Sequence, residues 1–227
     1  MPRFHLDGFT LEIPKHCLNS AIETAIEQGH YEAKELAGIK RHLKPGDRVL
    51  DLGGGAGYLA LQAAKVVGAQ NVTTVEANPE MVHVIGKNLA LNDAVDLRVL
   101  HGAVVADDFT QDSVSFEARA AFWASSILKG SPGKKSQLID VPALKLRDLF
   151  QACEPSFVVM DVEGAEVALA QQDWVETVRL VIMEIHPQLY SPRVIQKIFD
   201  GLSRAGFAYM PWGSRGNVVV FQRLTAD

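Results

Sequence analysis

The sequence predicts an α/β protein with a Rossmann-like, mostly parallel sheet of seven strands and helices on both faces. Short apolar runs alternate with helical stretches from residue 48 onward, a pattern typical of a parallel sheet built from βαβ units. A glycine-rich turn at residues 53–57 separates the first such run from an Ala/Leu-rich helical stretch. Two extended segments, 207–210 and 217–222, predict a closing hairpin after five β/α units.

The first 44 residues are expected to form an extension that precedes the sheet. Residues 4–13 alternate weakly around Asp7-Gly8, which indicates a two-residue hairpin. Ser20 and Glu23 have the spacing of a capping box, so we expect a helix from 20 to 28. A second helix is expected over 32–43, before Pro45-Gly46 turns the chain into the first core strand.

The core elements follow in order. We expect strands at 48–52, 71–76, 96–102, 156–162 and 179–185, and helices at 58–67, 79–91, 146–152, from Glu163-Gly164 to near Trp174, and from Ser191 or Pro192 to 205. Pro79 suits the first turn of its helix, because a proline lacks the amide hydrogen that would have no intrahelical partner there. The chain length suits one domain over 1–227.

Residues 107–140 interrupt this rhythm. Extended structure is expected over 113–121, and the Gly-, Pro- and Lys-rich residues 129–136 indicate an exposed loop. We therefore expect an inserted β-hairpin near the substrate side, although a hairpin that merely covers a sheet edge would give the same pattern. A basic patch at Lys129, Lys134 and Lys135 is the alternative to a solvated loop, and the solvated loop is favoured.

Composition limits the class of protein. The net charge is −5, which argues against a general nucleic-acid binder. The two cysteines, Cys17 and Cys153, lack metal-ligand spacing and are expected to be reduced thiols. No signal peptide or bilayer-spanning run is evident, so we expect a cytoplasmic protein with no membrane contact.

Polar residues stand at the ends of four predicted strands, and ligands of open parallel sheets bind at these carboxyl ends. They are Asp51, Glu76, Asp161, Glu163, Glu184 and His186. An acid at Asp51 would neutralise the ammonium group of a bound amino acid, and one at Glu76 would accept the hydroxyls of a ribose. The glycine spacing, Gly-x-Gly-x-Gly, lacks the fingerprint of dinucleotide binders and favours S-adenosylmethionine over NAD.

Four segments resemble the FkbM-type enzymes among the class I S-adenosylmethionine-dependent methyltransferases. They are Gly-His-Tyr-Glu at 29–32, residues 43–53, Val-Glu-Ala-Asn-Pro at 75–79 with Asn88 and Asn92, and Asp-Val-Glu-Gly-Ala-Glu at 161–166, with weaker support from 184–187 and Ser125-Ser126. One departure is residues 54–57, where the family more often has Ala-Asn between the glycines. The resemblance implies the class I methyltransferase fold.

The same resemblance implies a set of cofactor contacts. They are Tyr31, Glu32, Asp51, Gly53, Gly55, Glu76, Ala77, Asn78, Ala103 and Asp161. Ordinary core packing is an equally good explanation of Tyr31.

Methyl transfer to a hydroxyl requires a group that removes the acceptor's proton. Asp161, Glu163 and His186 are the candidates. His186 titrates in the useful range, but a structural hydrogen bond would explain it equally well. Asp161 could instead hold the cofactor's amine, and Glu166 is explained by the dipole at a helix start. Asp161, Glu163 and Glu184 together could also bind a divalent cation, but no clear ligand spacing demands one, so no metal site is predicted.

We therefore expect O-methylation of a small-molecule hydroxyl, on a sugar, polyketide or other secondary metabolite, with nucleic acid an unlikely partner. The preference for oxygen comes from the resemblance. RNA or protein methylation is the alternative, opposed by the acidic charge and the absence of an Asn-Pro-Pro-Tyr motif. A non-catalytic S-adenosylmethionine-binding module is a third hypothesis. The oligomeric state is open.

Overall fold

The computed structural model describes residues 1–119 and 136–225. Seven of the strands in these ranges form a central sheet in the order β11-β12-β10-β9-β3-β4-β5. Their bounds are β3 (Val49–Leu52), β4 (Val72–Glu76), β5 (Arg98–His101), β9 (Phe157–Met160), β10 (Leu180–Glu184), β11 (Phe207–Arg215) and β12 (Val218–Arg223). β12 runs antiparallel to both neighbours, whereas β3, β4, β5, β9 and β10 pair in parallel. The predicted sheet is confirmed.

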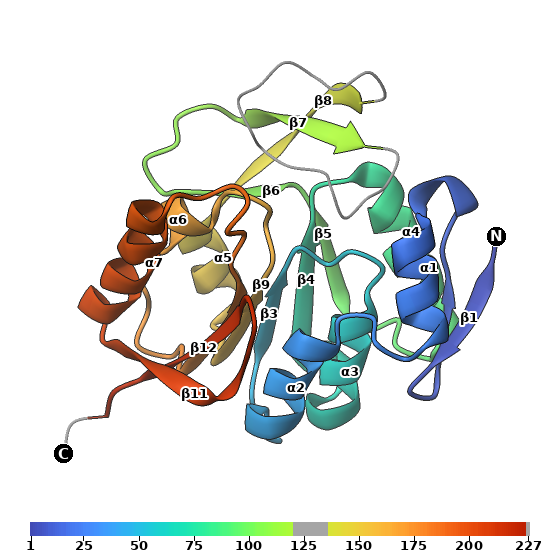
Figure 1. Cartoon of the computed structure of the whole chain (residues 1–227), viewed down its shortest axis with the longest axis horizontal. Coiled ribbons are helices and arrows are strands. Elements are labelled where there is room, and N and C mark those ends of the chain that lie inside the picture. Colours follow the sequence, from blue (N-terminus) through green and yellow to red (C-terminus); the bar gives the residue numbers. More distant parts are fainter. Residues whose placement is uncertain (120–135, 226–227) are drawn as a thin grey trace.

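Helices cover both faces of this sheet (Figure 1). They are α1 (Ser20–Glu27), α2 (Ala33–His42), α3 (Tyr58–Val67), α4 (Pro79–Leu91), α5 (Leu146–Cys153), α6 (Glu166–Leu169) and α7 (Pro192–Arg204). Successive strand residues alternate between two cores: Val49 packs with α2, α3 and α4, and Leu50 packs with α5 and α7. The central strands are apolar on both faces because each face is covered.

The N-terminal hairpin forms at the predicted place. β1 (Arg3–Leu6) and β2 (Phe9–Glu12) pair around Asp7 and Gly8, which both have positive φ as a tight hairpin turn requires. The helix that follows is capped by Asn19, whose Oδ1 accepts a hydrogen bond from the Ile22 amide at 2.8 Å. The predicted capping by Ser20 is therefore wrong by one residue.

The segment after β5 forms a separate sheet in the order β6-β8-β7, with β6 (Ala103–Val105), β7 (Ser113–Arg119) and β8 (Ser136–Lys145). β7 and β8 pair antiparallel, in agreement with the predicted inserted hairpin. Figure 1 shows the hairpin lying across one end of the central sheet. Of the loop expected at 129–136, residues 129–135 with their three lysines lie outside the described residues, as do Ser125-Ser126, and Ser136 already belongs to β8.

The hairpin marks the carboxyl ends of the parallel strands. β6 follows β5 directly, and the Gly102 amide between them donates to the carbonyl of Glu76 at the end of β4. Across the described ranges, no helix is both long and apolar enough to traverse a bilayer.

Candidate active site

The glycine turn after β3 is fixed by its own neighbours. Gly53, Gly55 and Gly57 all have positive φ. A Cβ on Gly53 would lie 1.8 Å from the carbonyl oxygen of Asp161, at the end of the adjacent strand β9. At Gly53, the absent side chain therefore makes room for the protein's own backbone.

Asp51 lies within β3, two residues before the turn. Its side chain is buried, and its Oδ2 accepts a hydrogen bond from Thr74 Oγ1 at 2.7 Å. Burial raises the pKa of Asp51 to about 7, against the opposing effect of the Thr74 hydrogen bond. Asp51 is thus a buried acid beside the glycine turn, as its predicted contact with the cofactor requires.

Glu76 ends β4 and is joined to the same turn. Its Oε2 accepts from the Gly55 amide at 2.9 Å, and its Oε1 accepts from the Asn78 amide at 2.7 Å. Burial raises the pKa of Glu76 to about 7, although these backbone hydrogen bonds oppose the shift. Ala77 follows directly, and Ala103 is buried next to Gly102 at the start of β6. The residues predicted to contact the adenosine part of the cofactor therefore lie next to one another, namely Glu76, Ala77, Asn78 and Ala103.

His186 is the centre of a second group of polar side chains, two residues beyond the end of β10. Its ring is buried, and its Nε2 lies 3.3 Å from Asp161 Oδ1 and 3.4 Å from Glu163 Oε1. Glu184 Oε2 lies 3.8 Å from the same nitrogen. Burial acts to lower the pKa of His186, but the surrounding carboxylates outweigh it and raise this pKa well above its usual range. The three predicted catalytic residues thus come together.

Glu166 supports this group and has a larger part than its predicted helix-dipole role. It is fully buried, and its Oε1 lies 3.1 Å from His186 Nδ1. Its carboxylate also accepts hydrogen bonds from the Gly164 amide, at 2.9 Å, and from the Tyr190 hydroxyl. Burial acts to raise the pKa of Glu166, but the hydrogen bonds from His186 and Tyr190 dominate and lower it.

The start of α2 adds two acids to the same region. Glu32 has φ 49° at the N-cap position, and Glu35 is buried one turn later. Burial raises the pKa of Glu32, and the charges of Glu35, Asp51 and Asp161 raise it further. Sequence reasoning missed Glu35, although its spacing from Ile39 places it on the apolar face of the helix.

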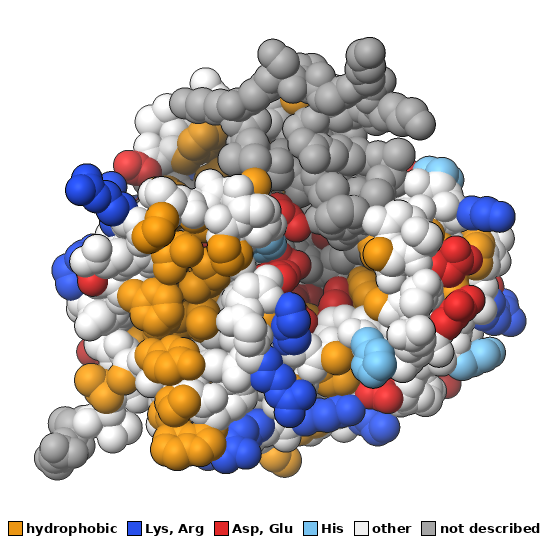
Figure 2. Space-filling model, in the orientation of Figure 1, with side chains coloured by type: hydrophobic (Ala, Val, Ile, Leu, Met, Phe, Trp, Pro, Cys, Tyr) orange, Lys and Arg blue, Asp and Glu red, His pale blue; other side chains and the backbone are white. Residues whose placement is uncertain are grey.

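Two buried polar atoms of the site have no hydrogen-bond partner among the described residues. They are the hydroxyl of Tyr31, whose ring packs on Tyr58, and Oδ1 of Asp161. Figure 2 shows acidic and histidine side chains gathered in a hollow on this face of the molecule. A cationic ligand with hydroxyl groups, such as S-adenosylmethionine, fits the negative charge and supplies partners for such atoms.

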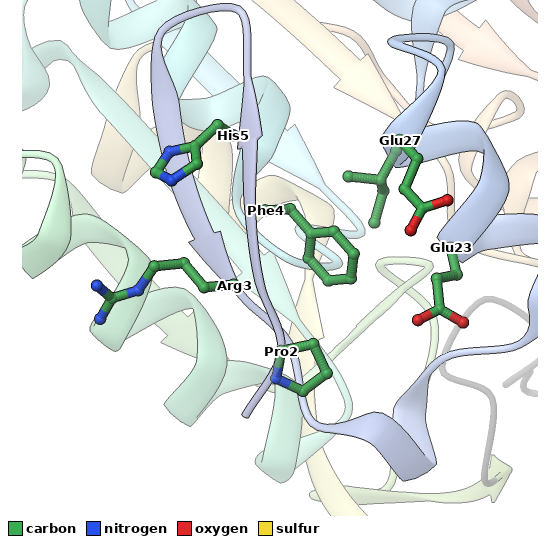
Figure 3. Close-up of a pocket in the computed structure, with 7 residues that line it drawn as sticks. Pro2, Arg3, Phe4, His5, Glu23 and Glu27 are labelled. Carbon is green, nitrogen blue, oxygen red and sulfur yellow. The ribbon is translucent and has the colours of Figure 1, made fainter.

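Another hollow lies between β1 and α1 (Figure 3). It is lined by Pro2, Arg3, Phe4, His5, Glu23, Ile26 and Glu27. None of these residues lies at the carboxyl end of a strand of the central sheet, so the acidic hollow is the candidate active site.

Comparison with known proteins identifies the class of fold and cofactor. A family model described as the TRM5/TYW2 methyltransferase domain matches residues 25–125. The chain is similar in structure to a methyltransferase from Pyrococcus furiosus, with a TM-score of 0.52 at 13% identity over 96% of this chain and 90% of the other. It is also similar to a ribosomal protein L11 methylase from Lactobacillus delbrueckii, with a TM-score of 0.50 at 18% identity over 86% and 80% of the two chains. The class I methyltransferase fold and S-adenosylmethionine as cofactor are thereby confirmed.

Curated relatives match over shorter stretches. The ribosomal protein L11 methyltransferase of Thermus thermophilus is 39% identical over 84 residues, 36% of this chain and 32% of that protein. Protein-L-isoaspartate O-methyltransferase 1 of Arabidopsis thaliana is 41% identical over 70 residues, 30% of each chain. The chain therefore spans about a third or less of the length of the relatives it matches first.

These matches correct two predictions. The resemblance to the FkbM family is wrong, because the family model and the curated relatives belong to other methyltransferases. The prediction of a small-molecule acceptor, with nucleic acid unlikely, is also wrong, because the curated relatives are named for protein acceptors and the matching family model is the TRM5/TYW2 methyltransferase domain.

Proposed function

We propose that this chain is an S-adenosylmethionine-dependent methyltransferase that modifies a protein. The observation that carries the proposal is the acidic hollow at the strand ends, where Asp161, Glu163, Glu184 and Glu35 lie near one histidine. Such a hollow attracts a basic segment of a protein acceptor. The names of the curated relatives, which specify ribosomal protein L11 and isoaspartyl protein, support the same class of acceptor.

In this proposal the residues of β3 and β4 hold the cofactor. Glu76, as a carboxylate, accepts hydrogen bonds from the ribose hydroxyls, and Asp51 neutralises the ammonium group. Tyr31 and Glu32 cover the cofactor from the start of α2. S-adenosylmethionine, when bound, supplies an activated methyl group on a sulfonium centre.

The residues after β9 and β10 receive the acceptor and its proton. The side chain of Asp161 is 38% exposed, whereas that of His186 is 4% exposed. Burial raises the pKa of Asp161, which suits a group that takes a proton near neutral pH. The raised pKa of His186 keeps its ring protonated there, so Asp161 or Glu163 is the better proton acceptor and His186 positions them.

RNA is the second candidate acceptor. Figure 2 shows Lys and Arg side chains gathered beside the hollow, and Lys34, Lys40 and Arg41 lie on α2. Such side chains would neutralise the phosphates of a bound strand.

The test is methyl transfer from labelled S-adenosylmethionine to two substrates in parallel, a ribosomal protein fraction and total RNA. We expect label in the protein fraction that is resistant to ribonuclease and sensitive to protease. Label in RNA alone would replace the protein proposal with the second candidate. Absence of S-adenosylhomocysteine binding would remove both.

A further inference from the structure

Nε2 of His186 faces the hollow and is surrounded by carboxyl oxygens of Asp161, Glu163 and Glu184. When these groups are ionised, their oxygens carry no proton and can only accept hydrogen bonds. Among the described residues, the ring makes one hydrogen bond, through Nδ1 to Glu166. On its other side, Nε2 lies 3.3 Å from Asp161 Oδ1 and 3.4 Å from Glu163 Oε1, without hydrogen-bond alignment. Asp161 Oδ1 is itself buried and unpartnered in the described part of the chain.

Glu166 fixes the orientation of the ring. Its carboxylate is fully buried and is held by the Gly164 amide and the Tyr190 hydroxyl. The carboxylate at Nδ1 keeps a proton on that nitrogen, so Nε2 is the ring atom that faces Asp161 and Glu163 and can exchange its proton for a metal ion. Two carboxylates in contact with Nε2 require a positive charge between them, which the Nε2 proton supplies in the metal-free ring and which a metal ion would supply in its place. This arrangement of a buried carboxylate behind a histidine is the usual support of a metal ligand.

The distances match the edges of a coordination polyhedron. A tetrahedral site with metal–ligand bonds of about 2.0–2.1 Å has ligand atoms about 3.3 Å apart. The facing atoms of Asp161, Glu163 and His186 all lie within 4.8 Å of one another, and two of their separations are 3.3 and 3.4 Å. A hydrogen bond between nitrogen and oxygen is shorter, at about 2.7–3.2 Å.

We propose that Asp161, Glu163 and His186 bind one divalent transition-metal ion, with Zn²⁺ the best match to an imidazole and two carboxylates in this geometry. Glu184 Oε2, 3.8 Å from Nε2, borders the site. Three protein ligands leave a position open toward the hollow for water or for an acceptor atom. The proposal concerns binding alone, so it holds whichever macromolecule is methylated. In the cation site considered from the sequence, Glu184 is the third ligand, whereas in the proposed site His186 takes that place and Glu184 lies at the border.

A rival cluster of ligands lies elsewhere in the described residues, at His16, Cys17 and Glu80. Its His16 Nε2 and Glu80 Oε1 already bond each other at 2.6 Å, and both side chains are largely exposed. No buried carboxylate orients that histidine in the described part of the chain. This cluster is therefore the weaker candidate, and Cys17 provides a matched control.

The test is calorimetric titration of the chelator-treated full chain with ZnCl₂, without S-adenosylmethionine. We expect one ion per chain, at least a tenfold weaker affinity in Glu163→Gln and His186→Gln, and unchanged binding in Cys17→Ser. Bound Co²⁺ should show visible absorption without a sulfur-to-metal charge-transfer band. Circular dichroism melts of the partly exposed Glu163 variant check that it folds.

Two results would overturn the proposal. One is wild-type binding no tighter than that of folded Glu163→Gln. The other is binding that Cys17→Ser abolishes and Glu163→Gln leaves intact, which would place the ion at the rival cluster.

Discussion

Gly53 has a backbone conformation and a close neighbour that together exclude a side chain. Its φ is +96°, and a Cβ there would lie 1.8 Å from the Asp161 carbonyl oxygen. We expect Gly53→Ala to separate β3 from β9, to lower the free energy of unfolding and to abolish S-adenosylhomocysteine binding. Urea unfolding and calorimetry would measure the two effects.

Gly46 supplies the control for this prediction. Its φ is +90°, but a Cβ there would meet nothing within 4 Å. Gly46→Ala should therefore cost only the conformational strain, about 1–2 kcal/mol, and keep cofactor binding. If both variants lost the same free energy of unfolding, the close approach of Gly53 to the Asp161 backbone would not explain the effect of Gly53→Ala.

Glu76 should contribute most to cofactor affinity through its charge. Each charge-assisted hydrogen bond to a ribose hydroxyl is worth about 1.5–3 kcal/mol, so Glu76→Gln should weaken S-adenosylhomocysteine binding roughly 10- to 100-fold. The variant keeps the shape of the side chain. Glu80→Gln, on the exposed first turn of α4, is the control. If calorimetry gave the wild type and Glu76→Gln dissociation constants for S-adenosylhomocysteine that agree within twofold, Glu76 would be rejected as the ribose ligand.

The sequence predicts the acids of the site better than their support. Asp51, Glu76 and Asp161 could be found because parallel strands bring their carboxyl ends to one edge. Glu166 is recognised as a central residue only when His186 and Tyr190, from beyond the next strand, are seen to contact it. Such contacts leave no periodic signal in the chain.

At the scale of elements, Asn88 joins three segments. It is fully buried in α4, its Oδ1 accepts from the Glu12 amide of β2 at 2.7 Å, and its Nδ2 donates to the Ala56 carbonyl of the glycine turn at 2.9 Å. Asn88→Ala should leave both backbone groups without their partner and cost about 2–4 kcal/mol.

Asn92, one turn later, is the comparison. It bonds Thr10 in the same hairpin but is half-buried, so water can replace its hydrogen bonds. Urea unfolding should show a smaller loss for Asn92→Ala than for Asn88→Ala. The reverse order would contradict the role of Asn88 as a buried junction.

The order of core elements could be predicted because apolar runs and glycine turns are local signals. The sheet formed by β6, β7 and β8 was predicted only in part. Gly102 separates β5 from β6, and β6 then pairs with a strand more than thirty residues later, a non-local contact. The prediction of the FkbM family failed for another reason. Acids and glycines at strand ends bind a cofactor that many methyltransferase families share, so these residues specify neither the family nor the acceptor.

At the scale of the whole molecule, the buried acids of the active site stabilise the fold when they are protonated, whereas cofactor binding favours their ionised form. Burial raises the pKa of both Asp51 and Glu76 to about 7, from ordinary values near 4. A carboxyl whose folded-state pKa is raised stabilises the fold at low pH, and this stability is lost as the pH rises through the folded pKa. His186, whose pKa is also raised, acts with the same sign above pH 6.5.

The metal-free, cofactor-free chain should therefore lose stability between pH 5 and pH 8. Residues with a lowered pKa, such as Asp47 and Glu166, change stability only below this window. We expect the melting temperature to fall by roughly 5–10 °C, in keeping with a few kcal/mol from the buried acids. Glu76→Gln should flatten the slope, and S-adenosylhomocysteine should oppose it because the ligand favours ionised Glu76. Calorimetric melts that stay level or rise over this window would contradict the raised pKa values of these acids.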